Sequence, residues 1–449
     1  MKFKIKGVGP IKNASVEMGN LTIVCGKNNT GKTFLTRTIY EFYQTFRGNL
    51  SFAVKTDQTT LPVDIDLSQY AANAAKAVKD CAKKYSKVFL DKGSLEISIE
   101  PTEFPVACAA PSSNWKIGNL HLRVEKKGTR LHIEEIASPI SSNEDNGHEE
   151  IAKTPSFQMI ISAIVQYYLF SQRCNNCFVS DSFSVMSERE GLVRFKAHIN
   201  IANAFIASQK KEADKKINVE IEGEDKVSDR KGLPLSLSLI RALSIFEREN
   251  LLKDRKQNDF QAQFNNELDA LVEGKYHIEK GEFFFTPDDA KDVTLSMDQS
   301  SSSVESLLLL DYYVRYFSEK GDVLVIDEPE MNLHPEKQRQ LARFLGTLVN
   351  AGIKVFITTH SDYIIREFNT MILLNQARPY IKKIRKVENY PDSQLLDAAD
   401  IKVYISKKKN GEVTFSEINI SQQKGMSIPT LNEVIDKMNS IQDAILWGE

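Results

Sequence analysis

Eight residues near the N-terminus have the types and the spacing of a loop that holds phosphate groups. Gly26, Gly31, Lys32 and Thr33 occupy every fixed position of the pattern G-x-x-x-x-G-K-[ST]. The glycines let the backbone curl without a Cβ atom, so that successive N–H groups and the N-terminus of a helix face the phosphates. Lys32 is then expected to reach the β- and γ-phosphates, and the Thr33 hydroxyl to coordinate Mg²⁺. The positions between the two glycines complete the predicted phosphate site: Lys27, Asn28, Asn29 and Thr30.

A pair of carboxylates and a histidine follow two later apolar runs. Asp327 and Glu328 end the run at 323–326, and His360 follows the run at 353–359. Such runs are typical of buried parallel strands, and open α/β sheets bind ligands at the carboxyl ends of their strands. We therefore predict that Asp327 holds Mg²⁺ through water, that Glu328 orients or deprotonates the attacking water, and that His360 touches the γ-phosphate. The alternatives are a glycine-rich turn with an ordinary surface lysine and a structural histidine.

The elements around the loop fit this role. The apolar residues 21–25 predict a strand directly before the loop, and a helix is expected from 34 to about 46 directly after it. Residues 2–6 alternate like a strand, and 14–17 form a candidate third strand. This strand, loop and helix are the context that the phosphate loop requires.

A long gap separates the loop from the later motifs. Roughly 260 residues lie between Thr33 and the next recognisable element at Leu295, more than a nucleotide-binding core needs. We therefore predict inserted lobes. The expected units are a nucleotide-binding core at 1–50 and 290–370, an inserted α+β lobe at 51–150, an inserted strand plus helical lobe at 151–289, and a C-terminal α+β extension of the core at 371–449.

The periodicity of apolar residues predicts the elements of these units. The first lobe is expected to contain a helix and then a small antiparallel sheet, and the second a strand and several helices. The predicted helices are 67–90, 155–173, 195–216, 235–255, 260–272, 304–317 and 428–438, and the predicted strands are 94–100, 120–125, 130–136, 177–185, 276–279, 282–285, 401–406 and 413–418. The polar stretch 138–150 is expected to be a flexible loop.

Composition narrows the class of protein. The chain has 449 residues, of which 41% are hydrophobic and 26% charged, with a formal charge of −2. This balance is typical of a globular protein, and any contact with DNA must be a local basic patch. We expect no membrane span and no signal peptide, since no apolar run is long enough for a span and the N-terminus alternates like a strand.

The cysteines indicate a reducing compartment. The chain has five, an odd number, so we expect a cytoplasmic protein without a disulfide framework. Cys174 and Cys177 have C-x-x-C spacing, but no second Cys or His pair lies at a distance typical of zinc sites. A metal or redox role for this pair is therefore the less favoured interpretation.

Four serines, beginning at Ser300, precede an apolar helix predicted from Val304. Ser301, Ser302 and Ser303 could simply cap that helix. The last of them lies 24 residues before Asp327, however, and this placement suggests a second interpretation.

The strings GKNNTGKT, LSMDQSSSSVESL, VLVIDEPEMNLHP and TTHSDYI, in this order, resemble the ABC-type ATPase heads of SMC proteins and of the overcoming-lysogenization-defect (OLD) family. The chain is most similar to OLD-related bacterial AAA-family ATPases, many of which act in anti-phage defence. The resemblance implies an α/β P-loop NTPase fold of the ABC-ATPase type with a mixed sheet. It also implies ATP and Mg²⁺ as cofactors.

The resemblance assigns further residues. Residues 332–335 match the D-loop, His360 matches the switch histidine, and Ser301, Ser302 and Ser303 match the signature motif that contacts ATP on the opposite subunit. This chain departs from the family pattern, because serines stand where the signature LSGGQ has glycines. No Q-loop glutamine is identifiable, and residues 188–189 are the stand-in. OLD proteins carry a Toprim nuclease, but no D-x-D occurs after Asn369, so we expect this chain to lack one.

Three functions are compatible with these observations. The favoured one is an ATP-hydrolysing switch that forms a homodimer or higher homo-oligomer by head-to-tail contacts and controls a separate effector, a nuclease or toxin in anti-phage defence. The second is an SMC-like ATPase that engages DNA directly in repair or maintenance. The third is the ATPase subunit of a transporter, which is disfavoured because such subunits have shorter insertions and a recognisable LSGGQ.

Overall fold

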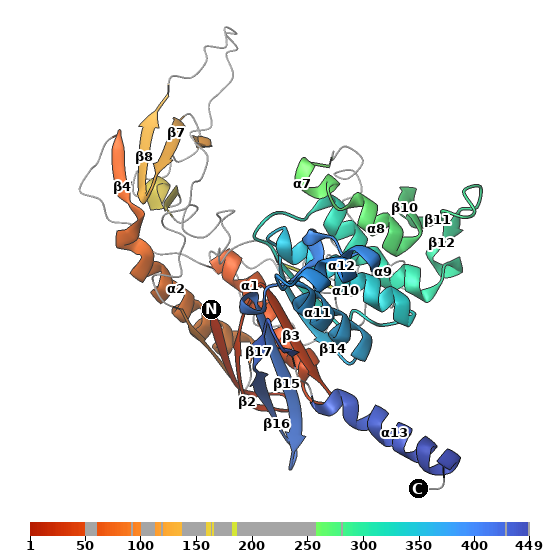
Figure 1. Ribbon diagram of the computed structural model, residues 1–449. Coiled ribbons are helices and arrows are strands. Elements are labelled where there is room, and N and C mark those ends of the chain that lie inside the picture. The colour runs from red at the N-terminus through yellow and green to blue at the C-terminus, as the bar shows by residue number, and fades with distance from the viewer. Residues whose placement is uncertain are drawn as a thin grey trace, which may run out of the picture.

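Figure 1 shows the computed structural model of the chain. The structure describes residues 1–49, 61–90, 93–99, 113–117, 120–136, 159–162, 164–165, 182–185, 257–279, 282–426 and 429–447. Several predictions fall outside these residues and stay predictions. They are the loop at 138–150, the helices at 195–216 and 235–255, the Q-loop stand-in at 188–189, and the Cys174 and Cys177 pair.

A nine-stranded mixed sheet is the framework of the fold. Its order is β5 (Ser94–Ser98), β1 (Lys2–Val8), β2 (Ile11–Glu17), β16 (Glu412–Ile418), β15 (Ile401–Lys409), β3 (Leu21–Gly26), β14 (Lys354–Thr359), β13 (Val323–Asp327) and β9 (Ser182–Val185). The five strands from β15 to β9 run parallel, whereas β1 is antiparallel to β2 and β5. The α/β fold with a mixed sheet predicted from the sequence is confirmed.

Side chains of the central strands alternate between two hydrophobic cores. In β13, Val323 and Val325 lie in one core and Leu324 and Ile326 in the other, and all four are buried. The first core is covered by α1 (Lys32–Asn49) and α2 (Ala71–Phe89). The second is covered by α8 (Asn265–Val272), α9 (Ser302–Tyr316), α10 (Pro335–Asn350), α11 (Asp362–Leu374) and α12 (Pro379–Val387), which Figure 1 shows on the other side of the sheet.

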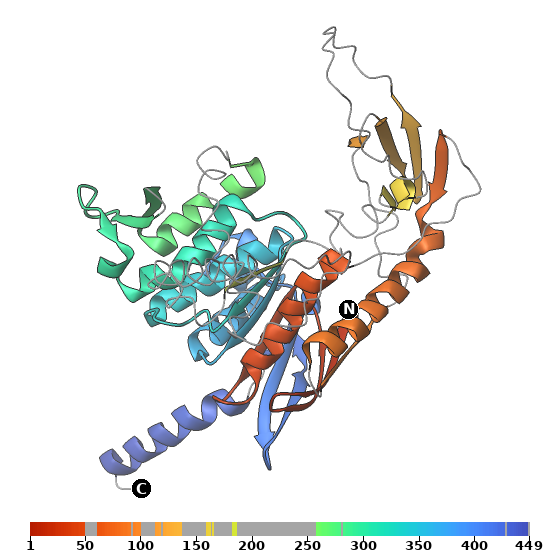
Figure 2. The same ribbon diagram turned by 180° about the vertical axis from the view of Figure 1, so that it is seen from behind.

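Within the described residues, three smaller sheets accompany the main one. They are β4 (Val63–Asp66), β8 (Arg130–Glu135), β7 (Leu120–Lys127) and β6 (Ser113–Ile117); β10 (Gly274–Glu279), β11 (Glu282–Pro287) and β12 (Leu295–Ser296); and β17 (Ile420–Ser421) with β18 (Gly425–Met426). The sheet with β7 and β8 stands at the end of α2 (Figure 2). Strand β4 was not predicted, because four residues are too few for a clear alternation of apolar and polar residues.

Two predictions about the inserted segments were wrong. The strand predicted at 94–100 was assigned to the small antiparallel sheet, but β5 pairs with β1 at the edge of the main sheet, where Leu95 and Ile97 are buried. The helix predicted at 260–272 is two helices, α7 (Asp259–Ala262) and α8. Asn258 and Gln261 form a capping box around the short α7.

The C-terminal segment supplies two strands of the main sheet. β15 lies between β3 and β16, parallel to β3 and antiparallel to β16. Within the segment 371–449, which was predicted to be a C-terminal α+β extension of the core, these two strands join the main sheet. The last helix, α13 (Pro429–Trp447), projects away from it (Figure 1). Within the described ranges, no helix is long and apolar enough to cross a membrane.

Candidate nucleotide site

Three neighbouring parallel strands bring the predicted residues to one edge of the sheet. β3 ends at Gly26, β14 at Thr359 and β13 at Asp327, in the spatial order β3, β14, β13. The register pairs Cys25 with Thr359 and Asp327 with Thr358. Since parallel strands present their carboxyl ends together, the phosphate loop, the two carboxylates and His360 meet in one place.

The loop has the backbone that a phosphate site needs. Gly26 and Gly31 have φ angles of 150° and 74°. A Cβ atom on Gly26 would lie 2.1 Å from Ser406 Oγ, so only glycine fits there. The Thr30 hydroxyl donates to the Lys27 carbonyl at 2.6 Å, and its Oγ1 lies 2.6 Å from Ser406 Oγ. Ser406, which lies in β15 near the C-terminal end of the chain, therefore supports the loop. No motif in the sequence predicts this role for Ser406.

Lys32 is buried at the base of the loop, with 4% of its surface exposed. Its ammonium donates to the carbonyl oxygens of Gly26 at 3.2 Å and Lys27 at 3.0 Å. Burial lowers the pKa of Lys32, while the carboxylates of Glu328 and Asp327 act in the opposite direction. The cation is thus partly desolvated, and a phosphate beside it would be attracted more strongly than in bulk water.

Asp327 joins the loop to the neighbouring strands. It is fully buried, its Oδ2 accepts a hydrogen bond from Thr33 Oγ1 at 3.0 Å, and its Oδ1 accepts one from Thr358 Oγ1. The Thr33 hydroxyl and the Asp327 carboxylate are hard oxygen donors of the kind that Mg²⁺ prefers. Their proximity fits the predicted metal site.

Glu328 and His360 face the same cleft as the loop. His360 Nε2 lies 3.3 Å from Glu328 Oε1. The Glu328 backbone has a φ of 52°, and its N–H donates to both Thr358 Oγ1 and the Thr358 carbonyl. Non-glycine residues in this left-handed region cluster at functional sites. The cleft has a volume of about 540 Å³ and is lined by Pro10, Asn28, Asn29, Thr30, Gly31, Lys32, Thr33, Phe34, Glu328, His360 and Lys408.

A third carboxylate, Glu330, positions the histidine segment. Its Oε1 accepts the backbone N–H of His360 at 2.5 Å, and its Oε2 accepts the Thr359 hydroxyl at 2.9 Å. Burial raises the pKa of Glu330, and these hydrogen bonds partly oppose the rise. No role was predicted for Glu330, although its place two positions after Glu328 in the DEPE string was a usable signal.

Glu330→Ala is expected to lower ATP turnover by about tenfold, because one charge-assisted hydrogen bond contributes roughly 1.5 kcal/mol or more to the placement of His360. ATP affinity measured by calorimetry should stay within about twofold, since Glu330 does not line the cleft. Glu330→Gln should retain most activity, because an amide can accept from His360 and donate to Thr359.

The control for this variant is Glu336→Ala, which removes an exposed carboxylate from the first turn of α10. It should have no effect on turnover. If Glu330 acts through the histidine, adding Glu330→Ala to a His360→Ala background should cause no further loss. Additive losses in the double variant would contradict the positioning role.

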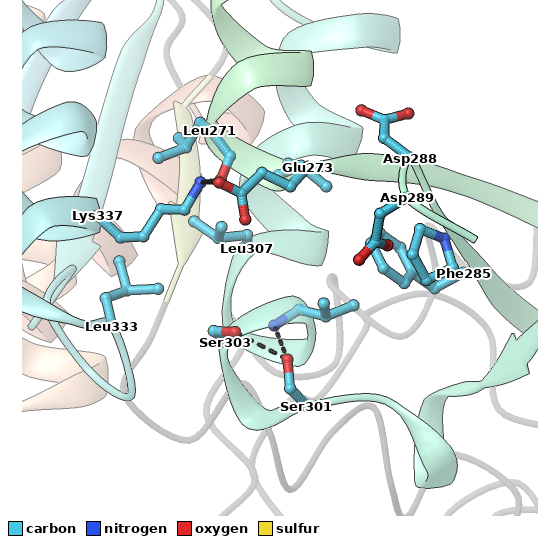
Figure 3. A pocket seen from close by; sticks show the side chains of 13 residues that line it. Leu271, Glu273, Phe285, Asp288, Asp289, Ser301, Ser303, Leu307, Leu333 and Lys337 are labelled. Atoms are coloured by element: carbon cyan, nitrogen blue, oxygen red, sulfur yellow. Dashed lines mark hydrogen bonds and ion pairs between the residues drawn. The ribbon is translucent and has the colours of Figure 1, made fainter. Parts of the chain in front are cut away.

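The serines lie apart from this cleft within one chain. Ser301 is the N-cap of α9, accepting from the Val304 N–H, and its Oγ lies 2.8 Å from Ser303 Oγ. Both line a separate pocket of about 410 Å³, together with Leu333 and Lys337 (Figure 3). Lys337 is held by the last carbonyls of α8 and by Glu273. The structure therefore places the serines beside the predicted D-loop and not beside their own phosphate loop.

The D-loop candidate forms a defined turn before α10. Asn332 has a φ of 59°, and His334 caps α10 by accepting the Glu336 N–H. The turn comes shortly after Glu328 in the chain. The Leu333 N–H donates a hydrogen bond to the Glu330 carbonyl. A single connected segment therefore carries the candidate base, the positioning carboxylate and the loop beside the serines.

Known proteins match this chain over different lengths. The energy-coupling factor transporter ATP-binding protein EcfA of Methanothermobacter thermautotrophicus is 29% identical over 84 residues, which is 19% of this chain. The chain spans about a quarter of that relative's length, 27%.

Among solved structures, the SMC head domain from Thermotoga maritima has 8% identity and a TM-score of 0.33, with 93% of this chain and 98% of that chain covered. An SMC head with an extended coiled coil, bound to the C-terminal domain of ScpA derived from Pyrococcus furiosus, has 11% identity and a TM-score of 0.36, with 98% of each chain covered.

The family match covers most of the chain. The model of the AAA ATPase domain family matches residues 1–365, a range that includes the phosphate loop, the carboxylates and His360. The chain therefore belongs to the AAA ATPase domain family, and the matched domain is an ATPase that binds ATP.

Proposed function

We propose that this chain is an ATP-driven switch: two copies close around ATP, hydrolysis separates them, and the change is passed to a separate effector. The observation that supports this is the separation of two half-sites in one chain. The cleft with Lys32 and Glu328 and the surface with Ser301 and Ser303 are different pockets. A twofold dimer in which each cleft faces the other chain's serines would complete two sites.

The main residues of the site have separate roles in this proposal. The triphosphate lies along residues 26–33, with Lys32 beside its outer phosphates. Thr33 and Asp327 would hold Mg²⁺, which would neutralise negative charge on the phosphates. Glu328 takes a proton from the attacking water, and His360 lies next to the γ-phosphate. Pro10 and Phe34, the apolar part of the lining, suit the purine ring.

The effector belongs to the proposal as well. The resemblance to OLD-related ATPases favours a nuclease or toxin in anti-phage defence as the controlled protein. The connected segment from Glu328 to the D-loop offers a route by which hydrolysis can alter the surface that another protein senses. The effector can be identified by testing whether the product of an adjacent gene co-purifies with this chain, with and without ATP.

The dimer is tested by sedimentation velocity with ATP, with ADP and without nucleotide. We expect a shift from monomer to dimer with ATP under conditions that block hydrolysis, and a return to monomer with ADP. A sedimentation coefficient that does not depend on the nucleotide would contradict the switch.

Lys32→Ala is expected to weaken ATP binding by roughly 10- to 100-fold, because it removes a charge-assisted contact to phosphate worth about 1.5–3 kcal/mol. Isothermal titration calorimetry measures the change. Lys79→Ala is the matched control, because it removes an exposed lysine of α2 that does not line the cleft. Equal affinities for both variants and the wild type would rule out the phosphate-loop assignment.

A further inference from the structure

Another lysine lines the nucleotide cleft, and it comes from the C-terminal part of the chain. Lys408 lies in β15 and is one of the residues that surround the cleft. It falls outside residues 1–365, the range that the family model matches, so the matched domain gives it no role. Its side chain is exposed, whereas Lys32 is buried at the base of the loop. The cleft therefore has a solvent-facing cation in addition to Lys32.

The alternation of side chains along β15 directs Lys408 toward the phosphate loop. Side chains two residues apart in a strand lie on the same face of the sheet. Ser406, two positions before Lys408, contacts the loop through Thr30, with 2.6 Å between the two hydroxyl oxygens. Lys408 therefore extends from the face of β15 that supports the loop.

The neighbouring strand β16 gives the same orientation. Lys408 is paired with Val413, and paired residues of antiparallel strands have their side chains on one face. A Cβ atom on Gly31 would lie 3.4 Å from Val413 Cγ1, and the Val413 N–H donates to the Pro10 carbonyl at 3.2 Å. Lys408 thus lies at the end of the cleft where the loop meets Pro10.

The ammonium of Lys408 has no salt-bridge partner among the residues that the structure describes. Other lysines of this strand region do have one. Lys402 Nζ lies 3.1 Å from Glu417 Oε1, and Lys12 Nζ lies 2.5 Å from Glu412 Oε1. A cation without an acidic partner, placed on the wall of a phosphate cleft, is suited to an anionic ligand.

The order of the strands indicates which phosphate Lys408 faces. Glu328 and His360 follow β13 and β14, on one side of β3, and the proposed function puts the γ-phosphate beside them. β15 lies on the other side of β3. Lys408 is therefore at the opposite end of the cleft, next to Pro10, where the purine is proposed to lie. The phosphate nearest to the purine is the α-phosphate.

We propose that Lys408 binds the α-phosphate of the nucleotide, so that β15 completes the nucleotide site of its own chain. This inference rests on the proposed function, which places the triphosphate along residues 26–33. A lysine ammonium is a compact point charge that binds phosphate oxygens without a fixed geometry. Because ATP and ADP share the α-phosphate, the contact holds both nucleotides and requires no second chain.

Lys408→Ala is expected to lower the affinities for ADP and for a non-hydrolysable ATP analogue by the same factor, about fivefold. The loss is smaller than for Lys32→Ala, since solvent weakens an exposed charge pair. Isothermal titration calorimetry measures both affinities, and Lys408→Arg, which keeps the charge, should stay within about twofold of the wild type. The matched control is Lys407→Ala, because Lys407 is an exposed neighbour on the opposite face of β15 that does not line the cleft.

Sulfur substitution in the ligand tests the point of contact. ADP with sulfur in place of one non-bridging oxygen of the α-phosphate exists as two diastereomers. The diastereomer whose sulfur faces Lys408 should bind the wild type more weakly than ADP does, and Lys408→Ala should bind the two ligands equally. Equal penalties in both proteins, for both diastereomers, would overturn the proposal.

The remaining outcomes separate Lys408 from the phosphate loop and from the dimer. Unchanged affinity in Lys408→Ala, with the expected loss in Lys32→Ala, would overturn the role of Lys408 and leave the loop assignment intact. No loss in either variant would overturn both assignments. A loss for the ATP analogue alone would place Lys408 at the γ-phosphate, and a changed preference for adenine over guanine nucleotides would place it at the base; each result contradicts the proposal. Binding of ADP requires no dimer, so failure of the proposed switch leaves this test unaffected.

Discussion

Glu328→Gln is expected to lower ATP turnover by about 10²–10⁴-fold, the usual contribution of a general base, while leaving ATP affinity within about twofold. The amide keeps the shape of the carboxylate and its contact with His360 Nε2, which lies 3.3 Å from Glu328 Oε1 in the wild type. It cannot take a proton from water. The backbone at this position is held by two contacts to Thr358, so the loop should keep its form.

The same variant is expected to accumulate as an ATP-bound dimer, since the hydrolysis that separates the two chains is blocked. Phosphate release gives the turnover, calorimetry the affinity, and sedimentation velocity the dimer. Glu330→Gln is an informative comparison, because it makes the same chemical change two residues away on a carboxylate that faces the protein backbone. Turnover of Glu328→Gln within twofold of the wild type would remove Glu328 from the mechanism.

Residues whose chemistry fixes both their type and their local spacing could be predicted from the sequence. Lys32 and Thr33 follow directly from the loop pattern, and Asp327 from its place at the end of an apolar run. Their meeting also followed, because parallel strands put their carboxyl ends at one edge. The observed bond between Thr33 Oγ1 and Asp327 Oδ2 is a consequence of that rule.

Contacts that depend on the order of strands could not be predicted. Ser406 touches the loop only because β15, from the far end of the chain, lies next to β3. β5 was assigned to the wrong sheet for a related reason. An alternating strand has the same pattern whichever sheet it joins, and the pairing of β5 with β1 is set by the burial of Leu95 and Ile97.

The role of the serines before α9 could not be decided from the sequence. A helix cap and a partner's phosphate contact both favour serine, so the residue type alone does not separate the two roles. Ser301 is the cap of α9, whereas Ser302 and Ser303 lie in its first turn with part of their surface exposed. A cap needs one side chain, so capping does not account for serine at positions 302 and 303, and the proposed contact with ATP on a second chain would account for it.

Ser302→Arg combined with Ser303→Arg is expected to abolish hydrolysis, because two bulky cations would hold the second chain away from the ATP interface. Binding of ATP to the monomer should remain near the wild-type affinity, since neither residue lines the cleft around Lys32. Ser301 is retained so that α9 keeps its cap, and thermal unfolding checks that the fold is intact.

Mixing this variant with Lys32→Ala should restore activity, although each is inactive alone. In a mixed dimer, one site joins an intact phosphate loop with intact serines, and the other site holds both changes. Random pairing makes about half of the dimers mixed, each with one working site, so about a quarter of wild-type turnover is the upper limit. A mixture that stays inactive while mass spectrometry shows mixed dimers would refute the shared site. Normal hydrolysis by the serine variant alone would refute it as well.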